Sequence, residues 1–176
     1  MNQDRTRPSS SEAPRGGTGS RDRDSLTAIP VSWISWSYEL RAGDAAAGTI
    51  VIPWLGEQGT FTSSGRSWTM AREAWLHGSF LMKQAGRSFA TADKPGAFFR
   101  SFQVSFDNEY FIWEAESPWG RSFLLRKGNA VIGSMRPVHT FSRRAAIDLP
   151  DDLSLERKAF LVWLALLMWR RHQSSN

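Results

Sequence analysis

The sequence predicts a mainly β protein, an antiparallel β-barrel or a strongly coiled sheet that surrounds a hydrophobic C-terminal helix. Two observations lead to this prediction. Apolar and polar residues alternate from Val31 to about Ile147, with turn signals between the runs, as is typical of antiparallel strands. The segment from Ala159 to Trp169 is apolar on every side, whereas a helix at a protein surface hides only one stripe. Other parts of the chain must therefore surround this helix.

The N-terminal segment differs from the rest in composition. Residues 9–23 are rich in Ser, Gly, Pro, Arg and Asp, and such a segment cannot bury enough apolar surface to offset its ordering entropy. We therefore expect a disordered tail over residues 1–28 and a single domain over residues 29–172. The tail has no apolar signal region. We expect the protein in the cytoplasm, with peripheral attachment to a membrane as the alternative.

The clearest strands lie in the second half of the chain. Residues Phe102, Val104 and Phe106 alternate with polar residues, so one strand face is apolar. The same pattern recurs between short turns at 107–108, 117–120 and 127–129, where Gly, Asn, Asp and Pro interrupt it. These signals predict a four-strand meander over Phe98–Phe106, Glu109–Glu116, Arg121–Arg126 and Val131–Met135.

The first half gives weaker signals of the same kind. Candidate strands are Ser32–Leu40, Thr49–Trp54, Ser67–Leu76, Ser79–Gln84 and Arg87–Thr91, and a last one is Arg144–Asp148. A helix over Ser67–Trp75 is the alternative, because its apolar residues fall at helical spacing. We favour a strand there, because Gly65 and Gly78 bracket the segment. The whole pattern predicts about 9–12 strands, which suits a barrel or sandwich.

The terminal helix is predicted from about Ser154 to Arg171. Asp151, Asp152 or Ser154 can cap its start, and Glu156 suits its first turn. The last turn carries Arg170, Arg171 and His172, which suit its negative end.

The lumen of a barrel is the simplest place for such a helix. Its apolar part is about 16 Å long, which is short for a bilayer core of about 30 Å. A barrel of about ten to twelve strands leaves room for a helix about 10 Å across, and the 9 Trp and 11 Phe suit a wide core. Burial between two protomers and insertion into lipid are the alternatives.

The predicted architecture resembles a known group of domains. The hairpins from Phe98 to Arg136, and the segment Leu149–Asp152 followed by the apolar run, resemble the tubby C-terminal, LURP-one-related and phospholipid-scramblase group. The resemblance covers residues 31–171 and is one of architecture. It implies a closed barrel of about twelve strands around the helix, and a basic patch that binds phosphoinositide headgroups.

The sequence offers few groups for catalysis or metal binding. It has no Cys, and its three His residues lie far apart, so we expect no metal and no cofactor. Glu114 and Glu116 lie two residues apart on one strand face, as paired catalytic carboxylates do, but a solvated face explains them as well. Asp148, Asp151 and Asp152 have the oxygen ligands that calcium prefers, although helix capping is the simpler explanation.

The basic residues are the strongest candidates for binding. The net charge is +5, and several cations fall on the meander and the loop after it. If they converge on one rim, they can bind lipid phosphates as arginine forks do; the simpler interpretation is a solvated face with scattered charges. We expect no nucleic acid as a partner, because no helix-turn-helix or RNA-binding aromatic signature is present. The candidate ligand-binding residues are Arg100, Arg121, Arg126, Lys127, Arg136, Arg143 and Arg144.

These observations favour a non-enzymatic binding or scaffold module whose partner is an anionic membrane phospholipid. An intracellular hydrolase or lipid-modifying enzyme and a protein–protein adaptor are the alternatives. Convergent buried acids in a pocket would favour the enzyme. Basic residues gathered on one face would favour the lipid binder, and an exposed apolar patch would favour the adaptor.

Overall fold

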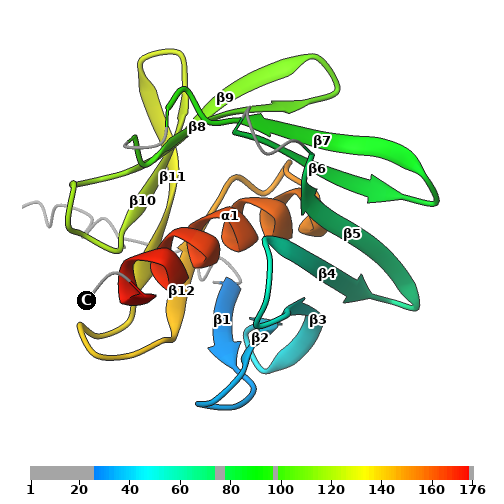
Figure 1. Cartoon of the computed structure of the whole chain (residues 1–176), viewed down its shortest axis with the longest axis vertical. Helices are drawn as coiled ribbons and strands as arrows, with labels where there is room; N and C mark the ends of the chain where they lie inside the picture. The colour runs from blue at the N-terminus through cyan, green and yellow to red at the C-terminus, as the bar shows by residue number, and fades with distance from the viewer. Residues whose placement is uncertain (1–25, 74–77, 97–98, 175–176) are drawn as a thin grey trace, which may run out of the picture.

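The structure is a closed barrel of antiparallel strands with one helix through its lumen (Figure 1). It is a computed structural model that describes residues 26–73, 78–96 and 99–174. The predicted fold class is confirmed. The strands are β1 (Leu26–Pro30), β2 (Trp36–Ala42), β3 (Ala45–Ile52), β4 (Gln58–Ser63), β5 (Arg66–Arg72), β6 (Ser79–Gln84), β7 (Arg87–Asp93), β8 (Ser101–Phe106), β9 (Glu109–Ala115), β10 (Phe123–Lys127), β11 (Ala130–Pro137) and β12 (Ala145–Asp148), and the helix is α1 (Leu155–Ser174).

The barrel closes through its first and last strands. Each strand pairs with the next along the chain, and β12 pairs back with β1 in the register Leu26↔Ile147 and Ala28↔Ala145. Closure leaves none of the described strands with an edge free for pairing with another chain. Alternate residues point inward, as Phe102, Val104 and Phe106 of β8 do.

The two ends of the barrel differ in their connections. At one end, which we call the turn rim, two-residue turns join the paired strands at 43–44, 64–65, 85–86, 107–108 and 128–129. At the other end, the loop rim, the connections are longer and comprise residues 31–35, 53–57, 73–78, 94–100, 116–122 and 138–144. The helix α1 runs from the turn rim to the loop rim, since Arg157 pairs with Asp107 while Arg170 donates to the Pro53 carbonyl.

The helix fills the lumen. Every side chain from Ala159 to Leu167 is fully buried, and Trp163 makes an edge contact with Phe80 of β6 and stacks on Phe160. In the described part of the chain, no polar or charged residue is buried. The lumen is therefore a packed apolar core whose axis is the helix itself.

Some elements differ from the sequence-based prediction. The strand β1 begins at Leu26, inside the segment expected to be disordered; the other residues of that segment lie outside the described part. The strand β4 was not predicted, and β3 begins at Ala45 rather than Thr49. The alternative of a helix after Ser67 is wrong over β5, which is a strand to Arg72, and the rest of that segment lies largely outside the described residues.

Candidate functional site

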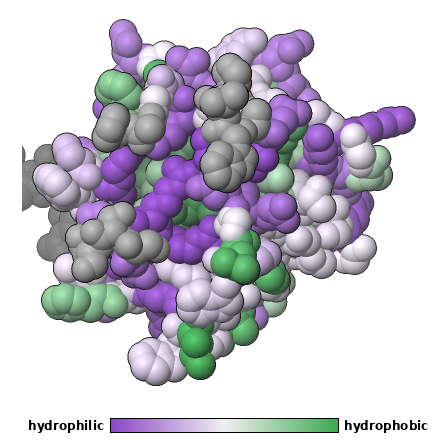
Figure 2. Space-filling model, in the orientation of Figure 1, coloured by the Kyte–Doolittle hydropathy of each residue, from purple (hydrophilic) through white to green (hydrophobic). Residues whose placement is uncertain are grey.

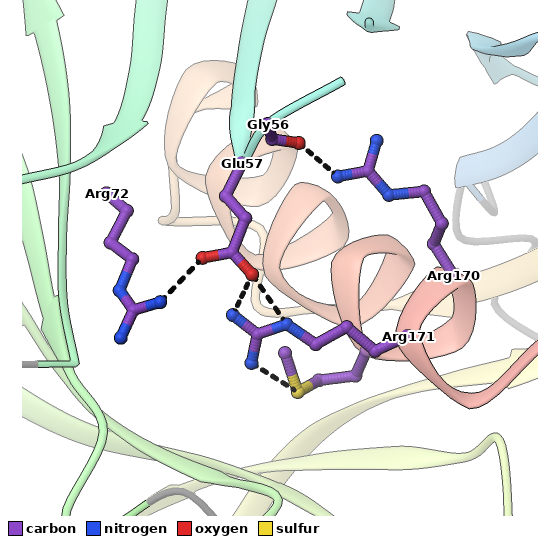
Figure 3. A network of polar contacts seen from close by, with 6 residues as sticks. Gly56, Glu57, Arg72, Arg170 and Arg171 are labelled. Atoms are coloured by element: carbon purple, nitrogen blue, oxygen red, sulfur yellow. Dashed lines mark hydrogen bonds and ion pairs between the residues drawn. The ribbon is translucent and has the colours of Figure 1, made fainter. Parts of the chain in front are cut away.

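Cationic side chains gather where α1 ends at the loop rim. Glu57 accepts hydrogen bonds from Arg72 Nη1 at 3.1 Å and from Arg171 Nε at 2.7 Å (Figure 3). Beside them, Arg170 Nη1 donates to the Pro53 carbonyl at 2.7 Å, and its second Nη donates to the Gly56 carbonyl. The connection between β3 and β4 is thereby tied to the end of the helix.

Lys94 belongs to the same group. It lies half-buried just after β7, and its pKa is lowered to about 8. Loss of solvation is the main cause, and the positive charges of Arg171, Arg72 and Arg100 add to it, while Glu57 opposes them. Part of the lowered pKa thus comes from neighbouring positive charges, which places Lys94 near Arg171, Arg72 and Arg100.

Arg100 and Arg121 extend the group along the rim. Arg100 Nη1 donates to the Pro118 carbonyl at 2.8 Å, and Arg121 Nη1 donates to the Thr140 carbonyl at 3.2 Å. The guanidinium of Arg121 also lies 4.0 Å from the ring centre of Trp169 in α1. Burial lowers the pKa of both arginines. Arg100 Nη2 and Arg121 Nε and Nη2 are buried and have no acceptor among the described residues, so these N–H groups have donor capacity left.

Arg143 holds the connection between β1 and β2. It donates to the Trp33 carbonyl at 2.7 Å, to the Ser35 carbonyl at 2.5 Å and to the Tyr38 hydroxyl at 3.3 Å. Its guanidinium lies 4.6 Å from the ring centre of Trp36. Burial raises the pKa of Tyr38, and the hydrogen bond from Arg143 partly offsets that rise. Arg143 therefore positions a loop as well as contributing charge.

Among the described residues, two cavities open on the loop rim. The larger, of about 640 Å³, is lined by apolar groups of Trp33, Trp36 and Trp54 and by the charged groups Arg143 and Arg170. The other, of about 590 Å³, includes Trp119, Arg121 and Phe141 in its wall. Both combine aromatic and guanidinium surfaces, which suits a ligand with polar and apolar parts.

The structure divides the predicted ligand-binding residues into two groups. Arg100, Arg121 and Arg143 lie at the loop rim, and Arg144 lies exposed beside Arg143. The others lie on the outer wall of the barrel, where each pairs with a carboxylate: Arg126 with Glu114 at 2.6 Å, Lys127 with Glu109 at 3.2 Å and Arg136 with Glu116 at 3.4 Å. These outer pairs explain Glu114 and Glu116 as charge partners on a solvated face.

Sequence reasoning missed part of the rim group. The candidate ligand-binding residues do not include Arg72, Lys94, Arg170 and Arg171, and the sequence links the last two to the negative end of the helix. The signal was present in the order of the strands. In an antiparallel barrel every second connection lies at the same end, and Arg72, Lys94 and Arg100 all flank such connections.

Neither a metal-binding cluster nor a membrane-spanning helix occurs among the described residues. Among the described residues, no group of three or more His, Asp or Glu side chains is placed to hold a metal ion. The Asp148, Asp151 and Asp152 set therefore does not form such a group. Within the same residues, no helix has both the length and the apolar character needed to cross a membrane.

The architecture is compatible with a tubby-like barrel, since the strands close around a C-terminal helix as that resemblance implies. Comparison of the chain with protein-family models, with curated proteins and with solved structures finds no match.

Proposed function

We propose that the protein is a non-enzymatic binding module whose loop rim binds the phosphate groups of anionic phospholipids at a membrane surface. The observation that carries the proposal is the gathering of Arg100, Arg121, Arg143 and Lys94 around the end of α1. The resemblance to tubby-like barrels, which implies phosphoinositide binding, adds support from architecture alone.

Two arginines at this rim have no carboxylate partner among the described residues, and this favours a phosphate ligand. Arg171 and Arg72 are engaged with Glu57, and Arg170 with backbone carbonyls. Arg100 and Arg121 each donate Nη1 to a backbone carbonyl, and neither guanidinium is paired with a carboxylate among the described residues. A phosphate oxygen accepts such charge-assisted hydrogen bonds well, and a guanidinium fork suits its geometry.

The described lumen favours binding over catalysis. An acid–base site needs a titratable group held in a pocket away from water. Among the buried side chains of the described lumen the titratable one is Tyr38, whose hydroxyl accepts a hydrogen bond from Arg143, and the carboxylate at the rim, Glu57, is engaged by two arginines. We therefore favour a binding module over a hydrolase as the function of this protein.

Flotation with lipid vesicles tests the proposal. The protein is mixed with neutral phosphatidylcholine vesicles or with vesicles that also contain phosphatidylserine or phosphatidylinositol bisphosphate, at about 50 mM and about 500 mM NaCl. We expect flotation with the anionic vesicles, weakened at high salt. The double variant R100Q/R121Q should bind about 10- to 30-fold more weakly, at about 1 kcal/mol for each charge near the surface.

A matched variant controls for net charge. R126Q/R136Q removes the same number of charges from the outer wall, where both arginines are paired with glutamates. It should bind anionic vesicles almost as well as the unaltered protein. Equal losses in the two double variants would show that the rim has no special role, and flotation with neither vesicle type would refute lipid binding.

A further inference from the structure

Large apolar side chains project from the loop rim into solvent. Trp33 is 88% exposed, Leu55 90%, Trp119 81% and Phe141 99%. They come from four different connections around the rim, and further exposed apolar residues accompany them. We call the whole set the loop crown: Val31, Trp33, Ile34, Trp54, Leu55, Phe99, Trp119, Val138 and Phe141.

The opposite end of the barrel has a different surface. Its two-residue turns consist of Gly43-Asp44, Ser64-Gly65, Ala85-Gly86, Asp107-Asn108 and Gly128-Asn129. The other large apolar residues described as exposed, Val51, Tyr110, Ile112 and Val131, lie within strands on the outer wall. In the described chain, the large exposed apolar residues of the connections thus belong to one rim.

The crown and the cations form two zones. Figure 2 faces the end of α1, with hydrophilic groups in the middle of the face and apolar groups at its lower edge, over the connections β1–β2 and β3–β4. The cations are set back, since Lys94 is half-buried and both Arg100 and Arg121 have fully buried guanidinium nitrogens. The cavity lined by Trp33, Trp54, Arg143 and Arg170 connects the two zones.

This arrangement matches the layers of an anionic bilayer. Tryptophan prefers the membrane–water interface, where its ring lies at the level of the headgroups with its apolar part toward the acyl chains and its N–H toward the polar groups. Cations set behind such rings would lie at the depth of the phosphates. A protein partner would favour a continuous apolar patch, whereas here apolar tips on separate loops surround a charged centre.

We infer that the loop crown inserts into the interface of an anionic bilayer. In this orientation the loop rim of the barrel faces the membrane and the turn rim faces water. This inference rests on the proposed function, because the same rim supplies the cations. It adds the mode of attachment and the orientation of the protein. It also implies that part of the binding resists salt, because the apolar contribution is not screened.

Labels at single positions test the insertion directly. The chain has no Cys, so one introduced thiol can be labelled without altering the rest. An environment-sensitive NBD fluorophore is placed at Leu55→Cys or Phe141→Cys on the crown, and at Asp44→Cys or Asn129→Cys on the turn rim. Vesicles containing phosphatidylserine should shift the crown labels to shorter wavelength, and lipids with a nitroxide on the acyl chain should quench them. The turn-rim labels should not respond.

The outcomes separate the two proposals. Flotation of the labelled proteins without quenching of the crown labels would overturn the insertion and leave phosphate binding intact. Quenching of the turn-rim labels would overturn the orientation. No flotation with any vesicle would overturn both proposals.

A second set of variants measures the contribution of the crown. The triple variant W33S/W54S/F141S should bind phosphatidylserine vesicles more than about tenfold more weakly, and its remaining binding should become fully sensitive to salt. The control Y110S/V131S removes exposed apolar groups from the outer wall and should bind as the unaltered protein does. Equal binding by the triple variant and the control would overturn the inference.

Discussion

Gly59 of β4 lies directly against the indole of Trp163 in α1. A Cβ atom at position 59 would lie 2.8 Å from Trp163 Cδ1 and 3.3 Å from Met70 Cε, and it would overlap the indole nitrogen. The wall of the barrel therefore carries no side chain at the point where the indole of Trp163 meets it. The close packing of protein interiors makes such a match specific to these two positions.

Replacing this glycine tests the match. We expect Gly59→Ala to lower the free energy of unfolding by about 1–3 kcal/mol, because the added methyl must displace a ring that is enclosed on all sides. Thermal or urea unfolding measures the change. Thr62 is exposed on the same strand, so Thr62→Ala should change the free energy of unfolding by less than about 0.5 kcal/mol. A Gly59→Ala protein as stable as the Thr62→Ala control would refute the packing argument.

The same contact explains why β4 was not predicted. The inward positions of this strand are Gly59 and Phe61, so only one large apolar residue marks the buried face. The missing bulk is supplied by Trp163, more than one hundred residues away in the chain. Alternation of apolar residues reveals a strand whose own side chains form its buried face. In β4, part of that face is covered by Trp163 of α1 instead.

The helix was predictable for the opposite reason. Its apolar residues cover every side from Ala159 to Trp169, and this local pattern has few physical solutions. Many alternating strands precede the helix. A barrel that closes around it pairs the edges of these strands and also covers the apolar surface of the helix. The twelve strands lie at the upper end of the range expected from the sequence.

Truncating the centre of the helix tests its role as the core. Leu164 is fully buried. We expect Leu164→Ala to cost about 2–5 kcal/mol, and Leu164→Asp to prevent folding, because its charge would have no partner in an apolar lumen. Circular dichroism and urea unfolding measure both effects. Val131→Ala, on the outer wall, is the control and should cost far less. A soluble, folded Leu164→Asp protein would contradict the lumen position of α1.

Arg143 and Arg144 are neighbours with different expected roles. Arg143 donates to two backbone carbonyls of the connection between β1 and β2, whereas Arg144 is exposed. We expect Arg143→Ala to lower the free energy of unfolding by about 1–3 kcal/mol and to speed hydrogen exchange over residues 32–38. Arg144→Ala should change neither quantity measurably. Similar exchange in the two variants would show that Arg143 does not hold this loop.

The sequence predicts only some of the residues of the candidate site, and the reason is geometric. Arginines that are close in the chain need not share a site, because a residue within a strand faces one side of the wall whereas a residue in a connection lies at the end of the barrel. Arg126 and Arg136 thus face the outer wall, while Arg121, which precedes its strand, reaches Trp169 at the rim. Lys94 and Arg72 join the site through connections that only the closed topology brings together.

Lys94 gives the rim a measurable dependence on pH. Its pKa falls from the ordinary value of 10.5 to about 8, mainly through loss of solvation, so the folded state releases the proton first. Between these two values the unfolded chain binds more protons, and the free energy of unfolding should therefore rise with pH, while below pH 8 the penalty is fully present.

Binding to anionic vesicles should change in the opposite direction, because the rim loses a positive charge when Lys94 is deprotonated. We expect weaker flotation at about pH 9 than at about pH 7, and no such change in Lys94→Arg, which keeps its charge at both values. The same pH dependence in Lys94→Arg as in the unaltered protein would exclude Lys94 as its source.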